Sequence, residues 1–173
     1  MTGAVLSIDD VNALTTARFT QVFGGIAEHA PWVAERAAGS RPFATRSAMV
    51  DAFQRAIASA GETEQTALLR AHPDLAGRAA LAGELTAEST REQAGAGLDT
   101  LTADEFARFT ALNDAYRARF GIPFILAVKG ATKHHILASF ESRIGGALVE
   151  ERMTALAQVL RIVRFRLEEK VAG

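Results

Sequence analysis

Two side chains of this chain are of the types that move protons near neutral pH. His72 is followed directly by Pro73 and Asp74, and Glu92 lies further along the chain. Because proline disfavours the helical conformation for the residue before it, we expect the His72 imidazole at the end of a helix, where it can point into a cleft. An imidazole and a carboxylate that meet in one pocket can act as general acid and base. The pattern therefore predicts acid–base chemistry.

His72 also has a purely structural interpretation. A cationic imidazole at a helix C-terminus is stabilised by the helix dipole, and proline and aspartate are common in ordinary turns. We assign Asp74 to fixing the turn rather than to the chemistry. The residue pattern alone leaves His72 open between catalysis and helix capping.

Three polar residues around Glu92 share one helix face. Ser89, Glu92 and Gln93 are spaced i, i+3 and i+4, so a hydroxyl, a carboxylate and an amide lie together. Such a face can hydrogen-bond a small polar molecule. The alternative is a solvated helix surface, which is the more common fate of charged faces.

Two arginines are candidates for holding an anion. Arg166 lies at the edge of the apolar stripe of the last expected helix, where a guanidinium can hold a carboxylate in a bidentate manner. The alternative is an arginine with a buried stem and a solvated head. Arg143 is a second possible anion partner, or it forms an ordinary ion pair within its own helix, where Glu141 lies nearby.

No pattern of metal ligands is present in the sequence. His134 and His135 are adjacent, so they point to different sides of a helix, and His29 is assigned a structural role. The chain has no cysteine, which excludes disulfides and thiolate metal sites. We therefore expect no metal site.

Composition points to one domain over residues 1–173. About half of the residues (49%) are hydrophobic, and a chain of 173 residues can bury a sizeable core of its own. The net charge of −1, with interspersed charges, gives no basis for binding nucleic acid or an anionic membrane. No apolar run reaches the ~18 residues of a membrane span, and the N-terminus does not resemble a signal peptide. We expect a cytoplasmic protein.

The elements that must position these residues are helices. Ser7 with Asp10, and Thr102 with Glu105, are spaced as capping boxes, and Pro31 suits a first helical turn. The pattern predicts an all-α, compact, single-domain bundle of about seven to nine helices. Expected helices begin near Ser7 and at Pro31, contain Phe19 to Ile26, and cover residues 45–60, 63–71, 86–96, 102–121, 131–144 and 147–171. The apolar stripe expected on the last helix consists of Leu148, Met153, Leu156, Val159, Leu160, Val163 and Leu167.

The apolar run at residues 121–128 is not expected to be helical. Its length and β-branched residues would allow a strand, but a single strand has no partner here. We expect an extended, buried connection. Its peptide groups then need hydrogen-bond partners, some of which a bound ligand could supply.

An ordered set of motifs across nearly the whole chain resembles the 2-oxo-4-hydroxy-4-carboxy-5-ureidoimidazoline (OHCU) decarboxylase family of urate degradation. The motifs are Glu28–Val33, His72–Gly77, Ser89–Gln93, Leu112–Tyr116, Phe120–Ile125, Ile136–Arg143 and Arg164–Leu167. The chain departs from the family pattern at Gly145-Gly146 and over residues 78–87.

The resemblance implies an all-helical homodimer that decarboxylates OHCU to (S)-allantoin without a cofactor. It gives the catalytic roles to His72 and Glu92 and makes Arg166 the residue that orients the substrate. The remaining substrate-binding residues that it implies are Pro73, Ser89, Gln93, Phe124, Ile125, Leu126, Ala127 and Val128. A hydroxyisourate hydrolase is a possible pathway neighbour.

Two other functions remain open at this point. A non-catalytic helical interaction module would explain the amphipathic stripes, although not the order of His72, Glu92 and Arg166. A metal-assisted ureide hydrolase could use His72, Asp74 and Glu92, and it would be sensitive to chelators.

Overall fold

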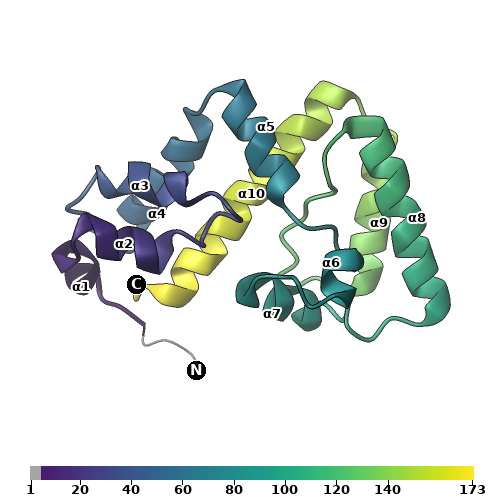
Figure 1. Cartoon of the computed structure of the whole chain (residues 1–173), viewed down its shortest axis with the longest axis horizontal. Helices are drawn as coiled ribbons and strands as arrows, with labels where there is room; N and C mark the ends of the chain where they lie inside the picture. The colour runs from purple at the N-terminus through teal and green to yellow at the C-terminus, as the bar shows by residue number, and fades with distance from the viewer. Residues whose placement is uncertain (1–4) are drawn as a thin grey trace. The chain divides into compact units, whose positions relative to one another are not determined.

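The computed structural model describes residues 5–173, and helices dominate it (Figure 1). The described residues form ten helices and contain no strand, only an isolated bridge between Leu6 and Val171. The helices are α1 (Ile8–Ala13), α2 (Thr16–Phe23), α3 (Pro31–Ala38), α4 (Arg46–Ala58), α5 (Glu62–Ala71), α6 (Arg78–Leu81), α7 (Ala87–Gly95), α8 (Ala103–Phe120), α9 (Lys133–Arg143) and α10 (Leu148–Lys170). The all-α prediction is confirmed.

The helix count is slightly higher than the predicted seven to nine. The additional element is α6, a single turn in the alanine- and glycine-rich segment before α7. It buries none of its residues, so the apolar pattern gave no signal for it. None of the helices in residues 5–173 is both long and apolar enough to cross a bilayer.

The helix ends follow from local sequence. The side chains of Ser7 and Thr102 each accept a hydrogen bond from the backbone N–H three residues later. The carboxylates of Asp10 and Glu105 in turn accept from the backbone N–H of Ser7 and Thr102, as in the predicted capping boxes. Gly121 ends α8 in the left-handed conformation, with φ of 69°, where glycine carries no steric penalty.

The chain divides into two compact units. Unit 1 contains residues up to Ala71 together with Leu160–Gly173, and unit 2 contains His72–Val159. Helix α10 therefore contributes its first part to unit 2 and its last part to unit 1. A single domain over residues 1–173 stays a prediction.

The core of unit 1 is aromatic. Phe19 and Phe23 of α2 pack with ring centroids 4.8 Å apart, and Phe53 of α4 lies 6.1 Å from Phe19. The Asn12 side chain joins α1 to the segment before α4. Its amide donates to the Phe43 carbonyl and accepts from the Phe43 N–H, each at 2.8 Å.

A second aromatic cluster forms the core of unit 2. Phe124 stacks on Phe140 of α9, with centroids 3.6 Å apart, and the edge of Tyr116 from α8 meets Phe124 at 5.4 Å. Tyr116 is fully buried and donates its hydroxyl hydrogen to Glu151 of α10. This core therefore buries a phenol next to a carboxylate.

Residues 122–128, which we call the connector, link α8 to the segment before α9. The connector is neither helix nor strand, and every residue in it except Leu126 is buried. The prediction of a buried, non-helical connection is confirmed for these residues, and its extended conformation stays a prediction.

Two details of the predicted helices were wrong. Ile26 lies beyond the end of α2, although it is buried. On α10, Leu148 and Met153 are 58% and 67% exposed, whereas Glu151 and Ala155 are buried. The stripe differs because Glu151 is drawn inward by polar partners, which a search for apolar residues does not detect.

We expect Tyr116 to keep its proton in the folded protein at about pH 11. Burial, and then the hydrogen bond to Glu151, raise the pKa of Tyr116 well above its ordinary value. The unfolded chain ionises its tyrosine near pH 10, so above about pH 10 the unfolded state binds fewer protons, and the free energy of unfolding should fall. Tyrosinate absorbance reports this residue alone, because the chain has one tyrosine.

The matched control is Tyr116→Phe, which removes this contribution to the pH dependence while keeping the ring. Tyrosinate absorbance that appears near pH 10 while circular dichroism remains native would contradict the expectation.

Candidate functional site

His72 is the first residue of unit 2 and follows directly on the last residue of α5. Helix α5 ends at Ala71, as expected from the proline after His72. His72 is 6% exposed, and its Nε2 atom is buried. The imidazole is therefore held inside the protein.

Two side chains, one from helix α7 and one from helix α8, form buried hydrogen bonds with the turn that follows His72. The N–H of Ala76 donates to Gln93 Oε1 at 2.9 Å, and Asn113 Nδ2 donates to the Leu75 carbonyl, also at 2.9 Å. Both bonds are buried. The turn is thus held by hydrogen bonds from neighbouring helices rather than by regular secondary structure.

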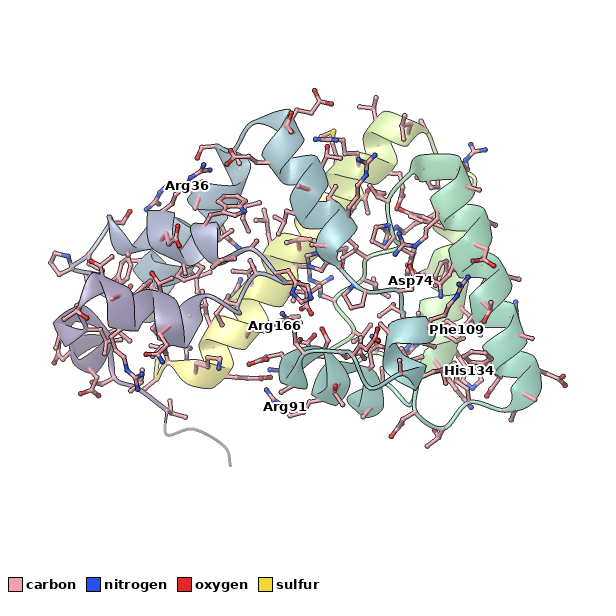
Figure 2. All side chains as sticks on the ribbon, in the orientation of Figure 1. Arg36, Asp74, Arg91, Phe109, His134 and Arg166 are labelled. Atoms are coloured by element: carbon pink, nitrogen blue, oxygen red, sulfur yellow. The ribbon has the colours of Figure 1, made fainter. Side chains whose placement is uncertain are left out.

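Asp74, which is labelled in Figure 2, forms an ion pair with Arg117 of α8. Arg117 Nε lies 2.9 Å from Asp74 Oδ1. Further along the turn, steric constraints limit which residues fit. Ala76 has a positive φ of 52°, and a Cβ added at Gly77 would lie only 2.6 Å from the Cβ of Asp74. Asp74 and Gly77 therefore shape the backbone that carries His72.

Helix α7 carries the other predicted polar residues. Thr86 caps its N-terminus, Ser89 and Gln93 are buried, and Glu92 is partly buried. For Ser89 and Gln93 the alternative of a solvated surface is wrong. Because Gln93 binds Ala76, α7 is tied directly to the turn after His72. A contact between His72 and Glu92 stays a prediction.

The predicted divergent segment borders α7. A cavity of about 600 Å³ in unit 2 is lined by Ala80, Leu81 and Leu85 from residues 78–87, and also by Ala76 and Gln93. The alanine-rich segment therefore supplies part of the surroundings of the Gln93–Ala76 contact.

Arg166, which is labelled in Figure 2, lies on α10. It belongs to unit 1. Its side chain is 2% exposed, so the alternative of a solvated head is wrong. Nη1 lies 2.9 Å from Glu28 Oε2 and 3.3 Å from the Ile26 carbonyl. The pair is fully buried, which fixes the orientation of the guanidinium.

Glu28 was not among the predicted site residues. Its carboxylate is buried, and His29 after it has a positive φ of 50°. Glu28 is the first residue of the first motif that resembles the family, and this motif was the only indication in the sequence that Glu28 could belong to the site. Its pairing with Arg166, near the other end of the chain, could not be predicted from local spacing.

Arg143 pairs with Glu151, not with Glu141 of its own helix. Arg143 Nε lies 2.8 Å from Glu151 Oε1, and Arg143 Nη1 donates to the Ile125 carbonyl at 2.8 Å. Glu141 instead pairs with Arg108 on the surface. The ion pair within α9 that the sequence allowed is thus wrong, and Arg143 holds the connector.

The residues of unit 2 include His72, Pro73, Glu92 and the connector, whereas Arg166 is in unit 1. Within residues 5–173, no group of three or more histidine, aspartate or glutamate side chains is placed to hold a metal ion. The roles of the predicted substrate-binding residues stay predictions.

Replacing Gln93 should loosen the turn after His72. Gln93→Ala leaves the buried Ala76 N–H without its acceptor, which should lower the free energy of unfolding by about 1–3 kcal/mol. Denaturant unfolding and amide exchange at Ala76 measure the loss. A free energy of unfolding and an Ala76 exchange rate that both stay at the wild-type values would contradict the role of this bond.

Replacing Glu28 should destabilise unit 1. Glu28→Gln keeps the shape but removes the Glu28 charge from beside the buried Arg166 guanidinium, which should lower the free energy of unfolding by about 3–5 kcal/mol. The fluorescence of Trp32, the chain's one tryptophan, follows unfolding of this unit.

The matched control is Glu168→Gln, which removes an exposed ion pair with Arg164 on the same helix. Exposed pairs contribute little to stability, so this variant should unfold like the wild type. Similar losses of unfolding free energy in Glu28→Gln and Glu168→Gln would show that burial of the ion pair does not determine how much its removal destabilises the protein.

Comparison with known protein families and relatives gives a consistent result. A family model described as OHCU decarboxylase matches residues 12–168. The OHCU decarboxylase of Haloferax volcanii is 43% identical over 168 residues, covering 97% of this chain and 98% of that protein. The uric acid degradation bifunctional protein of Bacillus subtilis is 37% identical over 165 residues, which make up 95% of this chain and 33% of that protein.

Solved structures agree with the sequence comparison. A crystal structure of (S)-allantoin synthase superposes with a TM-score of 0.76 at 32% identity, covering 96% of this chain and 54% of that one. A crystal structure of OHCU decarboxylase in the presence of (S)-allantoin has a TM-score of 0.65 at 20% identity, covering 79% and 87%, and supports the fold alone. The chain belongs to the OHCU decarboxylase family.

Proposed function

We propose that this protein decarboxylates OHCU to (S)-allantoin in urate degradation without a cofactor. The observation that carries the proposal is the family match over residues 12–168, which includes every residue assigned to the site. The tie between α7 and the turn after His72 supports it, because it brings the helix of Glu92 against the segment of His72.

The substrate itself can accept the electrons that the reaction releases. When the bond to the carboxylate breaks, carbon dioxide leaves and the electron pair of that bond forms a double bond between the two ring carbons. The π pair of the adjacent C=N bond moves to the ring nitrogen, which takes up a proton, so the intermediate has a carbon–carbon double bond, a ring N–H and a hydroxyl group. Addition of a proton to the ureido-bearing carbon and loss of the hydroxyl proton then yield allantoin.

His72, oriented by Glu92, hydrogen-bonds the hydroxyl and carboxylate region and manages the hydroxyl proton. Delivery of a proton to one face of the intermediate sets the (S) centre. General acid–base assistance of this kind contributes typically ~10²–10⁴-fold, and positioning of the substrate adds to it. The partial burial of Glu92 and the burial of His72 favour such a role, since desolvation strengthens their interactions.

Polar side chains and the connector bind the substrate. Ser89 and the amide NH₂ of Gln93 hydrogen-bond its polar groups, since the Gln93 oxygen already accepts from Ala76. Pro73 and residues Phe124–Val128 form the wall and the main-chain contacts. Arg166 orients the substrate, and Glu28 orients Arg166 through Nη1.

The protein acts as a cytoplasmic homodimer next to a hydroxyisourate hydrolase in the same pathway. Support for a pathway link comes from the Bacillus subtilis relative, a bifunctional protein of uric acid degradation of which this chain matches one third.

The expected result for His72→Ala and Glu92→Gln is a folded protein with most of its turnover lost, by about 10²-fold or more. Freshly generated OHCU loses its ultraviolet absorbance as it reacts, and circular dichroism of the product identifies the enantiomer. The controls are His134→Ala and Glu84→Gln, which change exposed residues of the same types and should leave both signals unchanged.

Near-normal formation of optically pure allantoin by either variant would refute the assigned roles. Wild-type protein that does not accelerate the decay of OHCU would refute the proposed function. Added chelator should leave turnover unchanged, whereas a metal-assisted ureide hydrolase would lose activity.

A further inference from the structure

We infer that Arg143 and Gln158 are positioning residues of this site, because they hold two neighbouring peptide groups of the connector from α9 and α10. The inference rests on the proposed function. It concerns how the connector presents its main chain to the substrate, and every contact used lies within unit 2.

The connector needs partners for its peptide groups. Among the described residues, positions 122–127 take part in no backbone–backbone hydrogen bond, although five of the six are buried. Buried peptide groups that lack hydrogen bonds are costly, so side chains or a ligand must satisfy them. Two of these groups are bound by side chains, at Ile125 and Ala127.

Arg143 binds the first of the two groups. Its Nη1 donates to the Ile125 carbonyl at 2.8 Å, and its guanidinium lies 4.4 Å from the centre of the Phe124 ring. Glu151 accepts from Nε and Nη2 of the same guanidinium, and Tyr116 also donates to Glu151. Glu151 therefore fixes the guanidinium plane through Nε and Nη2, and this orients Nη1 toward the Ile125 carbonyl.

Gln158 of α10 binds the second group. Its Oε1 accepts from the Ala127 N–H at 3.1 Å. Because a trans peptide group is planar, its N–H and C=O point in opposite directions. The two contacts therefore aim the Leu126 N–H away from Arg143 and the Leu126 C=O away from Gln158.

Leu126 is also the connector residue that is not fully buried. Its main chain offers one donor and one acceptor, which is the pattern that a ureide or ring amide of the substrate complements. Arg143 and Gln158 do not touch the substrate in this scheme. They act through the connector by keeping these two groups in place.

The test compares two variants of Gln158 that differ in whether an acceptor remains. Gln158→Met removes the oxygen that binds Ala127, so KM should rise by about 10-fold or more while kcat stays within about twofold, as for a lost uniform binding contact. Gln158→Glu keeps an acceptor oxygen and should retain most of the wild-type KM. Amide exchange at Ala127 should become faster only in the methionine variant.

Arg143→Lys provides an independent variant. It keeps the positive charge beside Glu151, so the protein should fold, but lysine cannot hold Glu151 and the Ile125 carbonyl with the same fixed geometry. KM should rise as in Gln158→Met. The matched control is Glu141→Gln on the same helix, which removes the exposed pair with Arg108 and should leave KM unchanged.

The outcomes separate this inference from the proposed function. Wild-type protein without turnover of OHCU overturns the proposed function, and the inference with it. Active wild-type protein with unchanged KM in Gln158→Met and Arg143→Lys overturns the inference alone. Equal damage by Gln158→Met and Gln158→Glu would also overturn it, because the acceptor oxygen would then not matter.

Discussion

The hydrogen bond from the Ala76 N–H to Gln93 is the contact on which the arrangement of the proposed site depends. The turn after His72 cannot satisfy its buried peptide groups by itself, so a neighbouring helix must supply an acceptor. That requirement draws α7 against the turn and brings the segment of Glu92 with it. Asn113 and Arg117 of α8 secure the same turn from another helix.

The same constraint recurs in the connector and around Arg166. In both places an arginine holds a backbone carbonyl, and a buried glutamate holds the arginine. Burying two charges costs solvation energy that the ion pair only partly restores. What such a pair provides is a defined direction for each guanidinium nitrogen, which a mobile solvated arginine would lack.

Local signals predicted much of the fold. The capping boxes at Ser7 and Thr102 and the end of α5 before Pro73 depend on neighbouring residues, and the structure shows them as expected. Contacts between distant positions were not accessible in this way. The pair of Arg166 with Glu28 joins residues 138 positions apart. At the start of α10, Glu151 is buried while Leu148 and Met153 of the expected stripe are exposed. Ser89 and Gln93 were found by their spacing, whereas their burial required the packed structure.

The close approach at Gly77 sets a limit on how this sequence can vary. The space beside Asp74 has no room for a side-chain atom, and this holds whatever reaction the protein performs. A homologue with a larger residue at this place must therefore have rebuilt the loop that presents its histidine. A glycine at this position therefore indicates, from sequence alone and independently of any catalytic group, that the loop after the histidine has the shape seen here.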